Sequence, residues 1–72
     1  MESSTKDTLS KRLVQLRTER GWTQSDLVEK MYLSQRSISK IEKGECTLSN
    51  LILLADLYEV SADYLLGRSA ER

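Results

Sequence analysis

Leucines recur at helical spacing in the first part of the chain. Leu9, Leu13 and Leu16 follow the i, i+4, i+7 pattern of an amphipathic helix, and Thr8 precedes them as a candidate N-cap. Gly21 then stands where helices commonly end. No stretch alternates apolar and polar residues as a half-buried strand does, and proline is absent. The pattern predicts a chain built from helices alone.

Two helix starts follow in quick succession. Thr23 is an N-cap residue with Asp26 three positions later, as in a capping box, and Ser34 repeats the cap signal. This spacing leaves room for about two helical turns and a connection of three or four residues. Helices so short have to cross, which is the helix-turn-helix geometry. We expect the second of these helices to span residues 35–43.

Two further helices complete the predicted fold. Thr47 opens one with an apolar stripe, and Ser61 opens a short one that Gly67 ends; the stripe is Leu51, Leu54, Ala55 and Tyr58. The prediction is an all-α, compact five-helix bundle that forms one domain over residues 8–67. Residues 1–7 and 68–72 are expected to be loosely ordered tails.

The helix expected over residues 35–43 has one apolar and one polar side. At about 100° per residue, Ile38 and Ile41 define the buried stripe. The opposite side is rich in groups that contact nucleic acid, since Arg and Gln pair with base edges while Lys and Ser serve phosphates or bases. Taken alone, such a side is as often a solvated surface, but the preceding helix and turn favour DNA. Its residues are Gln35, Arg36, Ser39, Lys40 and Lys43.

Glu42 falls near the buried stripe of the same helix, where an unpaired carboxylate is costly. The first helix offers Arg12 and Arg17 as partners. The alternative is that Glu42 extends to water.

Composition excludes several classes of protein. The chain has 72 residues, one cysteine (Cys46) and no histidine, so an internal disulfide, a cysteine-based zinc site and a histidine triad are all excluded. There is no Gly-rich phosphate loop and no nucleophile–base spacing. We therefore expect no enzyme, no cofactor, no metal and no small-molecule substrate. No apolar run reaches membrane-spanning length and no signal-peptide stretch opens the sequence, so a cytoplasmic protein is expected.

Charge is distributed unevenly although the formal net charge is zero. Residues 1–47 carry nine Lys/Arg and seven Asp/Glu, whereas residues 48–67 carry three acids and no base. A chain of this kind should bind nonspecific DNA weakly and depend on base contacts and dimerisation.

The chain resembles the DNA-binding domain of phage-repressor and Cro-type regulators, the XRE family of five-helix helix-turn-helix proteins. The resemblance covers residues 9–67, and its motifs are specific in combination. They are Arg12-Leu13-x-x-Leu16-Arg17-x-x-x-Gly21-Trp22-Thr23-Gln24-x-x-Leu27, Ser34-Gln35-x-x-Ile38-Ser39-x-Ile41-Glu42-x-Gly44, and Leu53-Leu54-Ala55-x-Leu57-Tyr58-x-Val60-Ser61-x-Asp63-Tyr64-Leu65-Leu66-Gly67.

The resemblance implies roles for individual residues. Gln24 would contact the DNA backbone, Gln35 and Arg36 would read bases, and Arg17 would pair with Glu42. The complete set expected at DNA is Gln24, Ser34, Gln35, Arg36, Ser37, Ser39, Lys40 and Lys43.

Three positions depart from the family pattern. Tyr32 stands where glycine is usual, so a bulky residue would adopt a left-handed conformation at a cost of about 1–2 kcal/mol. Val28 replaces a small residue, and the loop over residues 44–47 is short and lacks proline. These departures suggest a reshaped helix crossing.

The sequence thus predicts a bacterial or phage-encoded, nucleoid-associated transcription regulator that binds double-stranded DNA. Family analogy favours a repressor that binds a palindromic operator as a homodimer. Tyr64 and Leu66 are the candidates for the dimer surface, with core packing as an equal alternative for Leu66. The competing hypothesis is a protein-interaction module, such as an antitoxin or anti-repressor partner, which an exposed apolar patch would favour. That patch would comprise Tyr58, Tyr64, Leu65 and Leu66.

Overall fold

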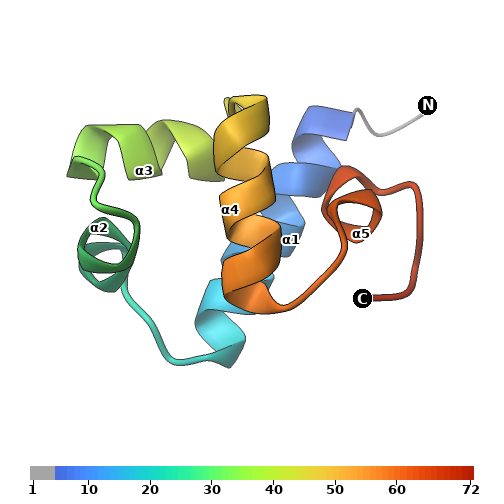
Figure 1. Cartoon of the computed structure of the whole chain (residues 1–72), viewed down its shortest axis with the longest axis horizontal. Helices are drawn as coiled ribbons and strands as arrows, with labels where there is room; N and C mark the ends of the chain where they lie inside the picture. The colour runs from blue at the N-terminus through green and yellow to red at the C-terminus, as the bar shows by residue number, and fades with distance from the viewer. Residues whose placement is uncertain (1–4) are drawn as a thin grey trace.

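The computed structural model describes residues 5–72, which form five helices and no strand (Figure 1). The predicted all-α five-helix fold is confirmed. The elements are α1 (Thr5–Glu19), α2 (Gln24–Met31), α3 (Gln35–Glu42), α4 (Leu48–Tyr58) and α5 (Ala62–Leu66). No helix in this part of the chain is both long and apolar enough to cross a membrane.

Helix α1 begins at Thr5, earlier than a cap at Thr8 would allow. No glycine or proline interrupts residues 5–8. The side chain of Thr8 contacts a distant part of the chain. A Cβ atom added to Gly67 would lie only 2.7 Å from the Cγ2 atom of Thr8, so the two residues are in close contact. Thr8 therefore packs against the end of α5 and does not cap a helix. Of the tail expected over residues 1–7, residues 5–7 are helical and residues 1–4 lie outside the described part.

The other helix starts are where the caps predict them. The side chains of Thr23, Ser34, Thr47 and Ser61 each accept a hydrogen bond from the backbone N–H three residues later. Thr23 also forms the reciprocal capping box, with its backbone N–H donating to Asp26 Oδ2 at 2.7 Å. Helix α3 ends at Glu42, so Lys43 is its C-cap and not its last residue.

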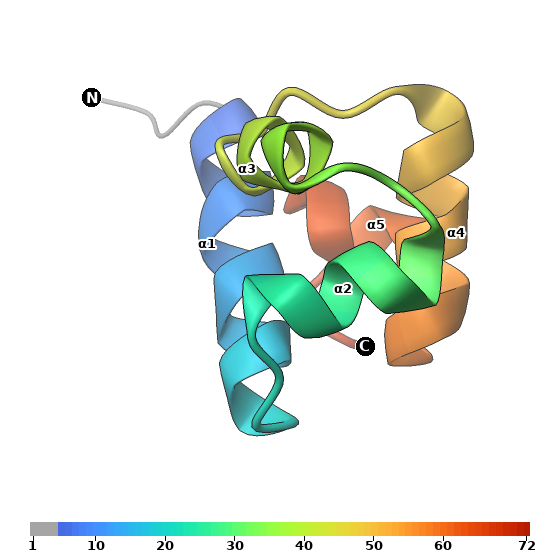
Figure 2. The same ribbon diagram turned by 90° about the vertical axis from the view of Figure 1, so that its left-hand side faces the viewer.

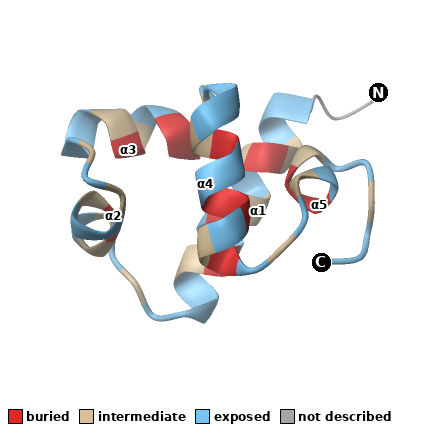
Figure 3. Cartoon of the chain, in the orientation of Figure 1, coloured by how far each residue is buried: buried red, intermediate tan, exposed pale blue. Residues whose placement is uncertain are grey.

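A single core lies where the helices meet (Figure 3). The leucines predicted for α1 and the stripe predicted for α4 are buried in it. Trp22 stacks on Tyr58 with ring centroids 5.7 Å apart, which closes the core near the end of α1. The core residues are Leu9, Leu13, Leu16, Leu27, Ile38, Ile41, Leu51, Leu54, Ala55, Tyr58, Tyr64 and Leu65.

Gly44 lets the backbone after α3 lie against α1. Its φ is +96°, and a Cβ there would stand 2.6 Å from the carbonyl oxygen of Lys6. Any other residue would be strained and would push α1 away from the end of α3.

Residues 68–72, for which a loosely ordered tail is predicted, make several hydrogen bonds with the rest of the molecule. The Arg72 carbonyl accepts a hydrogen bond from the Ser61 N–H at 2.8 Å, and the Arg72 guanidinium donates two bonds to Glu19, at 2.8 and 2.7 Å. These hydrogen bonds lower the pKa of the Glu19 carboxyl. Arg12 also donates to the Ser69 carbonyl. Sequence periodicity carries no sign of such contacts, because they join residues eleven to fifty-seven positions apart.

The same contacts cover Tyr64. Its side chain is buried, with the guanidinium carbons of Arg12 and Arg72 at 4.2 and 5.5 Å from the ring centroid. Leu66 is half-buried against the core. The prediction that Tyr64 presents a dimer surface is wrong for this reason, and the apolar patch proposed for a protein partner is largely interior.

Tyr58 is the one residue of the core with an unsatisfied polar atom. Its hydroxyl is buried and makes no hydrogen bond within residues 5–72. Burial, reinforced by the negative charge of Glu42, raises the pKa of Tyr58 from 10.0 to about 12. The neutral phenol is therefore the form that the fold stabilises.

This pKa predicts how stability depends on alkaline pH. The folded pKa exceeds the unfolded one, so the contribution of Tyr58 is complete below about pH 10 and is lost as pH rises toward about 12. We expect Tyr58→Phe to unfold at no lower temperature than wild type at pH 8, and to lose less stability at pH 11.

Thermal melts at both pH values measure the difference, and Tyr32→Phe is the matched control because that ring is 93% exposed. An equal alkaline loss in wild type and Tyr58→Phe would contradict the assignment.

Candidate nucleic-acid interface

Helices α2 and α3 cross steeply, with α3 nearly end-on when α2 runs across the view (Figure 2). The turn between them passes through Tyr32, whose φ of 56° and ψ of 38° are left-handed. The strained conformation expected at this glycine position is therefore present. Val28 is half-buried against the core at the crossing. The crossing of α2 and α3 thus accommodates Tyr32 and Val28, the two departures from the family pattern that lie at this point.

Helix α3 turns its polar side outward, as its sequence predicts. Gln35, Arg36, Lys40 and Lys43 are exposed, while Ser39 is half-buried beside α2. Ile38 and Ile41 are buried on the other side. An exposed row of one guanidinium, two ammonium groups and an amide can contact both base edges and phosphates.

The first turn of α3 is fixed by its own serines. Ser34 Oγ accepts from the Ser37 N–H at 3.1 Å and donates to Ser37 Oγ at 3.0 Å. The N-terminus of a helix carries a partial positive charge, which favours a phosphate. Both hydroxyls lie at this end of α3.

Glu42 is buried at the inner side of α3, with its side chain 5% exposed. Arg17 Nε donates to Glu42 Oε2 at 2.7 Å, and Arg17 Nη1 donates to the Trp22 carbonyl at 2.9 Å. The ion pair expected from the sequence is present, and Glu42 does not extend to water. Arg12, the other candidate, instead donates to the Tyr64 and Ser69 carbonyls.

The second oxygen of Glu42 orients a chain of amides that ends on the outer face. Glu42 Oε1 accepts from Gln24 Nε2 at 2.9 Å, and Gln24 Oε1 accepts from Gln35 Nε2 at 3.1 Å. A carboxylate can only accept, so Gln24 has to present its NH₂ inward and its oxygen outward. Gln35 must in turn give one N–H to Gln24. Ser39 Oγ also contacts Gln24 Oε1, at 3.5 Å.

This order leaves defined groups for a ligand. Gln35 retains one N–H and its Oε1, neither of which is bonded within the described residues, and Gln24 retains one N–H. A donor and an acceptor on one amide match N7 and N6 of adenine. The polar side of α3 indicated Gln35 and the family resemblance indicated Gln24, but neither indicated this orientation, because it depends on the position of Glu42.

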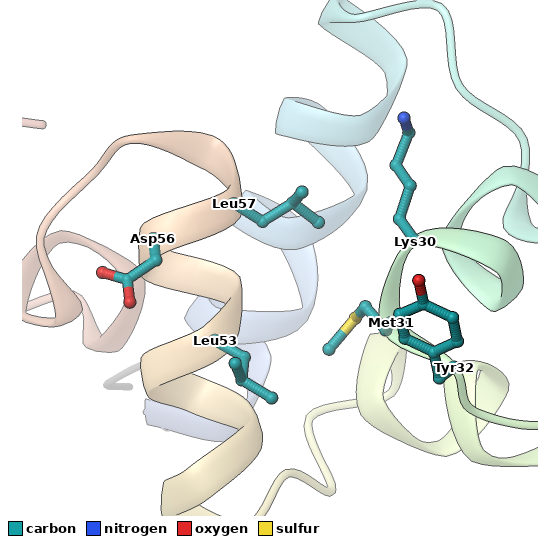
Figure 4. A pocket seen from close by; sticks show the side chains of 6 residues that line it. All are labelled: Lys30, Met31, Tyr32, Leu53, Asp56 and Leu57. Carbon is teal, nitrogen blue, oxygen red and sulfur yellow. The ribbon is translucent and has the colours of Figure 1, made fainter.

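One hollow lies away from this face, between the end of α2 and α4 (Figure 4). It measures about 420 Å³ and is mainly apolar. The Met31 side chain extends across it toward α4 (Figure 4). Its lining residues are Lys30, Met31, Tyr32, Leu53, Asp56 and Leu57. Sequence reasoning did not place these six residues around one hollow, since only the packing of α2 beside α4 brings them together.

The fold, the crossing and the outward polar side of α3 define a helix-turn-helix domain. The family model described as helix-turn-helix matches residues 13–65, so the chain belongs to this family, and the resemblance to XRE-type domains is confirmed. The HTH-type transcriptional regulator ImmR of Bacillus subtilis (strain 168) is 37% identical over 62 residues, which cover 83% of this chain and 49% of that protein. The chain thus spans about half the length of this relative. No solved structure gives a significant match.

The pair of Arg17 and Glu42 generates a stability prediction. Glu42→Ala would leave Arg17 without its buried partner, and breaking one side of such a pair costs about 3–5 kcal/mol. In a small domain this is a large part of the free energy of unfolding.

Chemical denaturation of Glu42→Ala beside the exposed control Glu45→Ala measures this cost. Similar midpoints for the two variants would show that Arg17 and Glu42 contribute little to stability.

Proposed function

We propose that this chain is a sequence-specific DNA-binding transcription regulator that reads base edges with α3. The observation that carries the proposal is the outward polar side of α3, on which Gln35 is held by the hydrogen-bonded chain that joins Arg17, Glu42 and Gln24. Membership of the helix-turn-helix family and the similarity to a transcriptional regulator support it.

The roles follow from exposure and chemistry. Gln35 and Arg36, at the start of α3, read bases, and Ser39 and Lys40 join them one turn later. Gln24 contacts the DNA backbone with its remaining N–H. The phosphate contacts come from Ser34, Ser37 and Lys43.

Zero net charge shapes the binding mode. Residues 48–67 carry three acids and no base, so long-range attraction to phosphate is small. A single α3 of eight residues also contacts only a few base pairs. We therefore propose that two copies bind a palindromic operator in the bacterial cytoplasm, and that they repress by blocking polymerase.

Selection of bound duplexes from a random DNA pool tests the proposed function. A defined, two-fold symmetric consensus is the expected result. Recovery of unselected sequence after repeated rounds would overturn sequence-specific binding.

Arg36 and Lys43 should behave differently on DNA. Arg36→Ala should lose about 1–3 kcal/mol on the selected duplex and lose preference at one base position. Lys43→Ala should weaken selected and random duplexes alike, and lower the salt dependence by about one unit. Titrations at several salt concentrations measure both effects. Equal losses for Arg36→Ala on selected and random duplexes would show that Arg36 does not read bases.

A palindromic operator predicts a difference between the whole site and half of it. The full palindrome should hold two copies and bind about 10²–10⁴-fold tighter than the half-site, because the second contact is made within one complex. Titration with mass measurement of the complexes gives affinity and stoichiometry. One copy per duplex, with equal affinity for both duplexes, would contradict dimeric binding.

A further inference from the structure

The N-terminal end of α1 lies against the C-terminal end of α3 (Figure 2). Ser10 Oγ donates a hydrogen bond to the Glu42 carbonyl at 2.5 Å, which joins the two helices at this point. Lys6 is one turn earlier on the same side of α1, and its side chain passes over Gly44. The start of α1 is therefore placed beside the residue that follows the C-cap of α3.

This packing puts a further cation at the end of α3. Lys6 is exposed, so its methylene groups cover Gly44 while its ammonium group is in solvent. Lys40 and Lys43 are exposed at the same end of α3, and Arg36 is exposed one turn before Lys40. A residue of α1 thus extends the row of cationic side chains that α3 presents.

The charge of Lys6 is unfavourable for α1 itself. Lys6 stands in the first turn of this helix, where the partial positive charge of the helix end disfavours a cation. The packing over Gly44 uses only the methylene groups, so it does not explain the charge. A local preference that is broken in this way is expected at a functional site. Lys6 also lies outside residues 13–65, the part that matches the helix-turn-helix family model.

The length of α3 shows what a cation at this end can reach. Its eight residues measure about 12 Å along the axis, which equals the width of the major groove of DNA, about 12 Å. Both ends of α3 would therefore come near the sugar–phosphate backbones that border the groove. Ser34 and Ser37 are at one end, and Lys43 and Lys6 are at the other.

We propose that Lys6 binds a phosphate of the DNA backbone that borders the groove at the C-terminal end of α3. The ligand is a phosphodiester oxygen, which an ammonium group binds as a point charge. The contact fixes the position of α3 in the groove and carries no sequence information. The inference rests on the proposed function, because it requires α3 to enter the major groove. Asp7 and Glu45 lie nearby in the sequence, so the attraction acts at short range.

Lys6→Met tests the contact, because it removes the charge and keeps an unbranched side chain over Gly44. The matched control is Lys11→Met, which removes the same charge from an exposed position of α1 about 140° farther around the helix. Both variants should keep the circular dichroism spectrum and melting temperature of wild type. Each is titrated at several salt concentrations with the selected duplex and with a random duplex.

We expect Lys6→Met to bind both duplexes more weakly than wild type by the same factor. The slope of log affinity against log salt concentration should become smaller by about 0.9, the value for one phosphate contact. Lys11→Met should keep the wild-type slope. A wild-type slope for Lys6→Met would overturn the proposal, as would an equal change of slope for Lys11→Met.

Duplexes in which one backbone phosphate is replaced by a neutral methylphosphonate locate the contact. Wild type should lose affinity when the phosphate at the C-terminal end of α3 is neutral, whereas Lys6→Met should bind that duplex as it binds the unmodified one. If every replacement weakened wild type and Lys6→Met by the same factor, Lys6 would contact no phosphate and the proposal would be wrong.

The random duplex separates this proposal from the proposed function. If selection gave no consensus, yet Lys6→Met alone lowered the salt slope on random DNA, the phosphate contact would be supported and sequence-specific regulation would fail. A defined consensus with an unchanged slope for Lys6→Met would support the proposed function and overturn the role of Lys6. A wild type that binds neither duplex would overturn both.

Discussion

The buried carboxylate of Glu42 is the constraint on which the arrangement of this domain depends. It lies on the inner side of α3, where an unpaired charge would be costly, and it is satisfied from two other helices. Arg17 comes from α1 and Gln24 from α2, at 2.7 and 2.9 Å. One carboxylate thus fixes the relative positions of the first three helices. Because a carboxylate only accepts, it also fixes the direction of every hydrogen bond that follows.

The chain of hydrogen bonds whose direction Glu42 sets runs from the core to the outer face of α3. The outward oxygen of Gln24 accepts from Gln35, so the amide of Gln35 is already oriented before any ligand binds. Such preorganisation lowers the entropy cost of binding. Under the proposed function it suits a chain with zero net charge, in which attraction to phosphate contributes little and correctly oriented base contacts have to contribute more.

Helix α1 and the residue that follows it, Arg20, stabilise this small domain through arginines as well as through leucines. Arg12 donates to the carbonyls of Tyr64 and Ser69, Arg17 to that of Trp22, and Arg20 to that of Tyr58. These guanidinium groups satisfy carbonyls near the ends of helices and in the C-terminal segment. The result is that the C-terminal part of the chain is tied to α1 and shields Tyr64. Three of the five large apolar side chains that stay exposed in the described chain are on α4.

The sequence by itself determined the number of helices, four of their starts, the stripes that form the core and the polar side of α3. These features depend on residues three or four positions apart, such as Thr23 with Asp26 or Leu51 with Leu54, and local spacing records them. The need for a cation beside Glu42 was also accessible, because an inward-facing carboxylate requires one, but the choice of Arg17 over Arg12 came from the family resemblance. Only the tertiary structure decided that Tyr64 is buried, that residues 68–72 lie against α1, and that the exposed apolar surface is on α4. Each of those outcomes depends on contacts between distant segments, and a helical period shows which side of a helix is apolar but not what covers it.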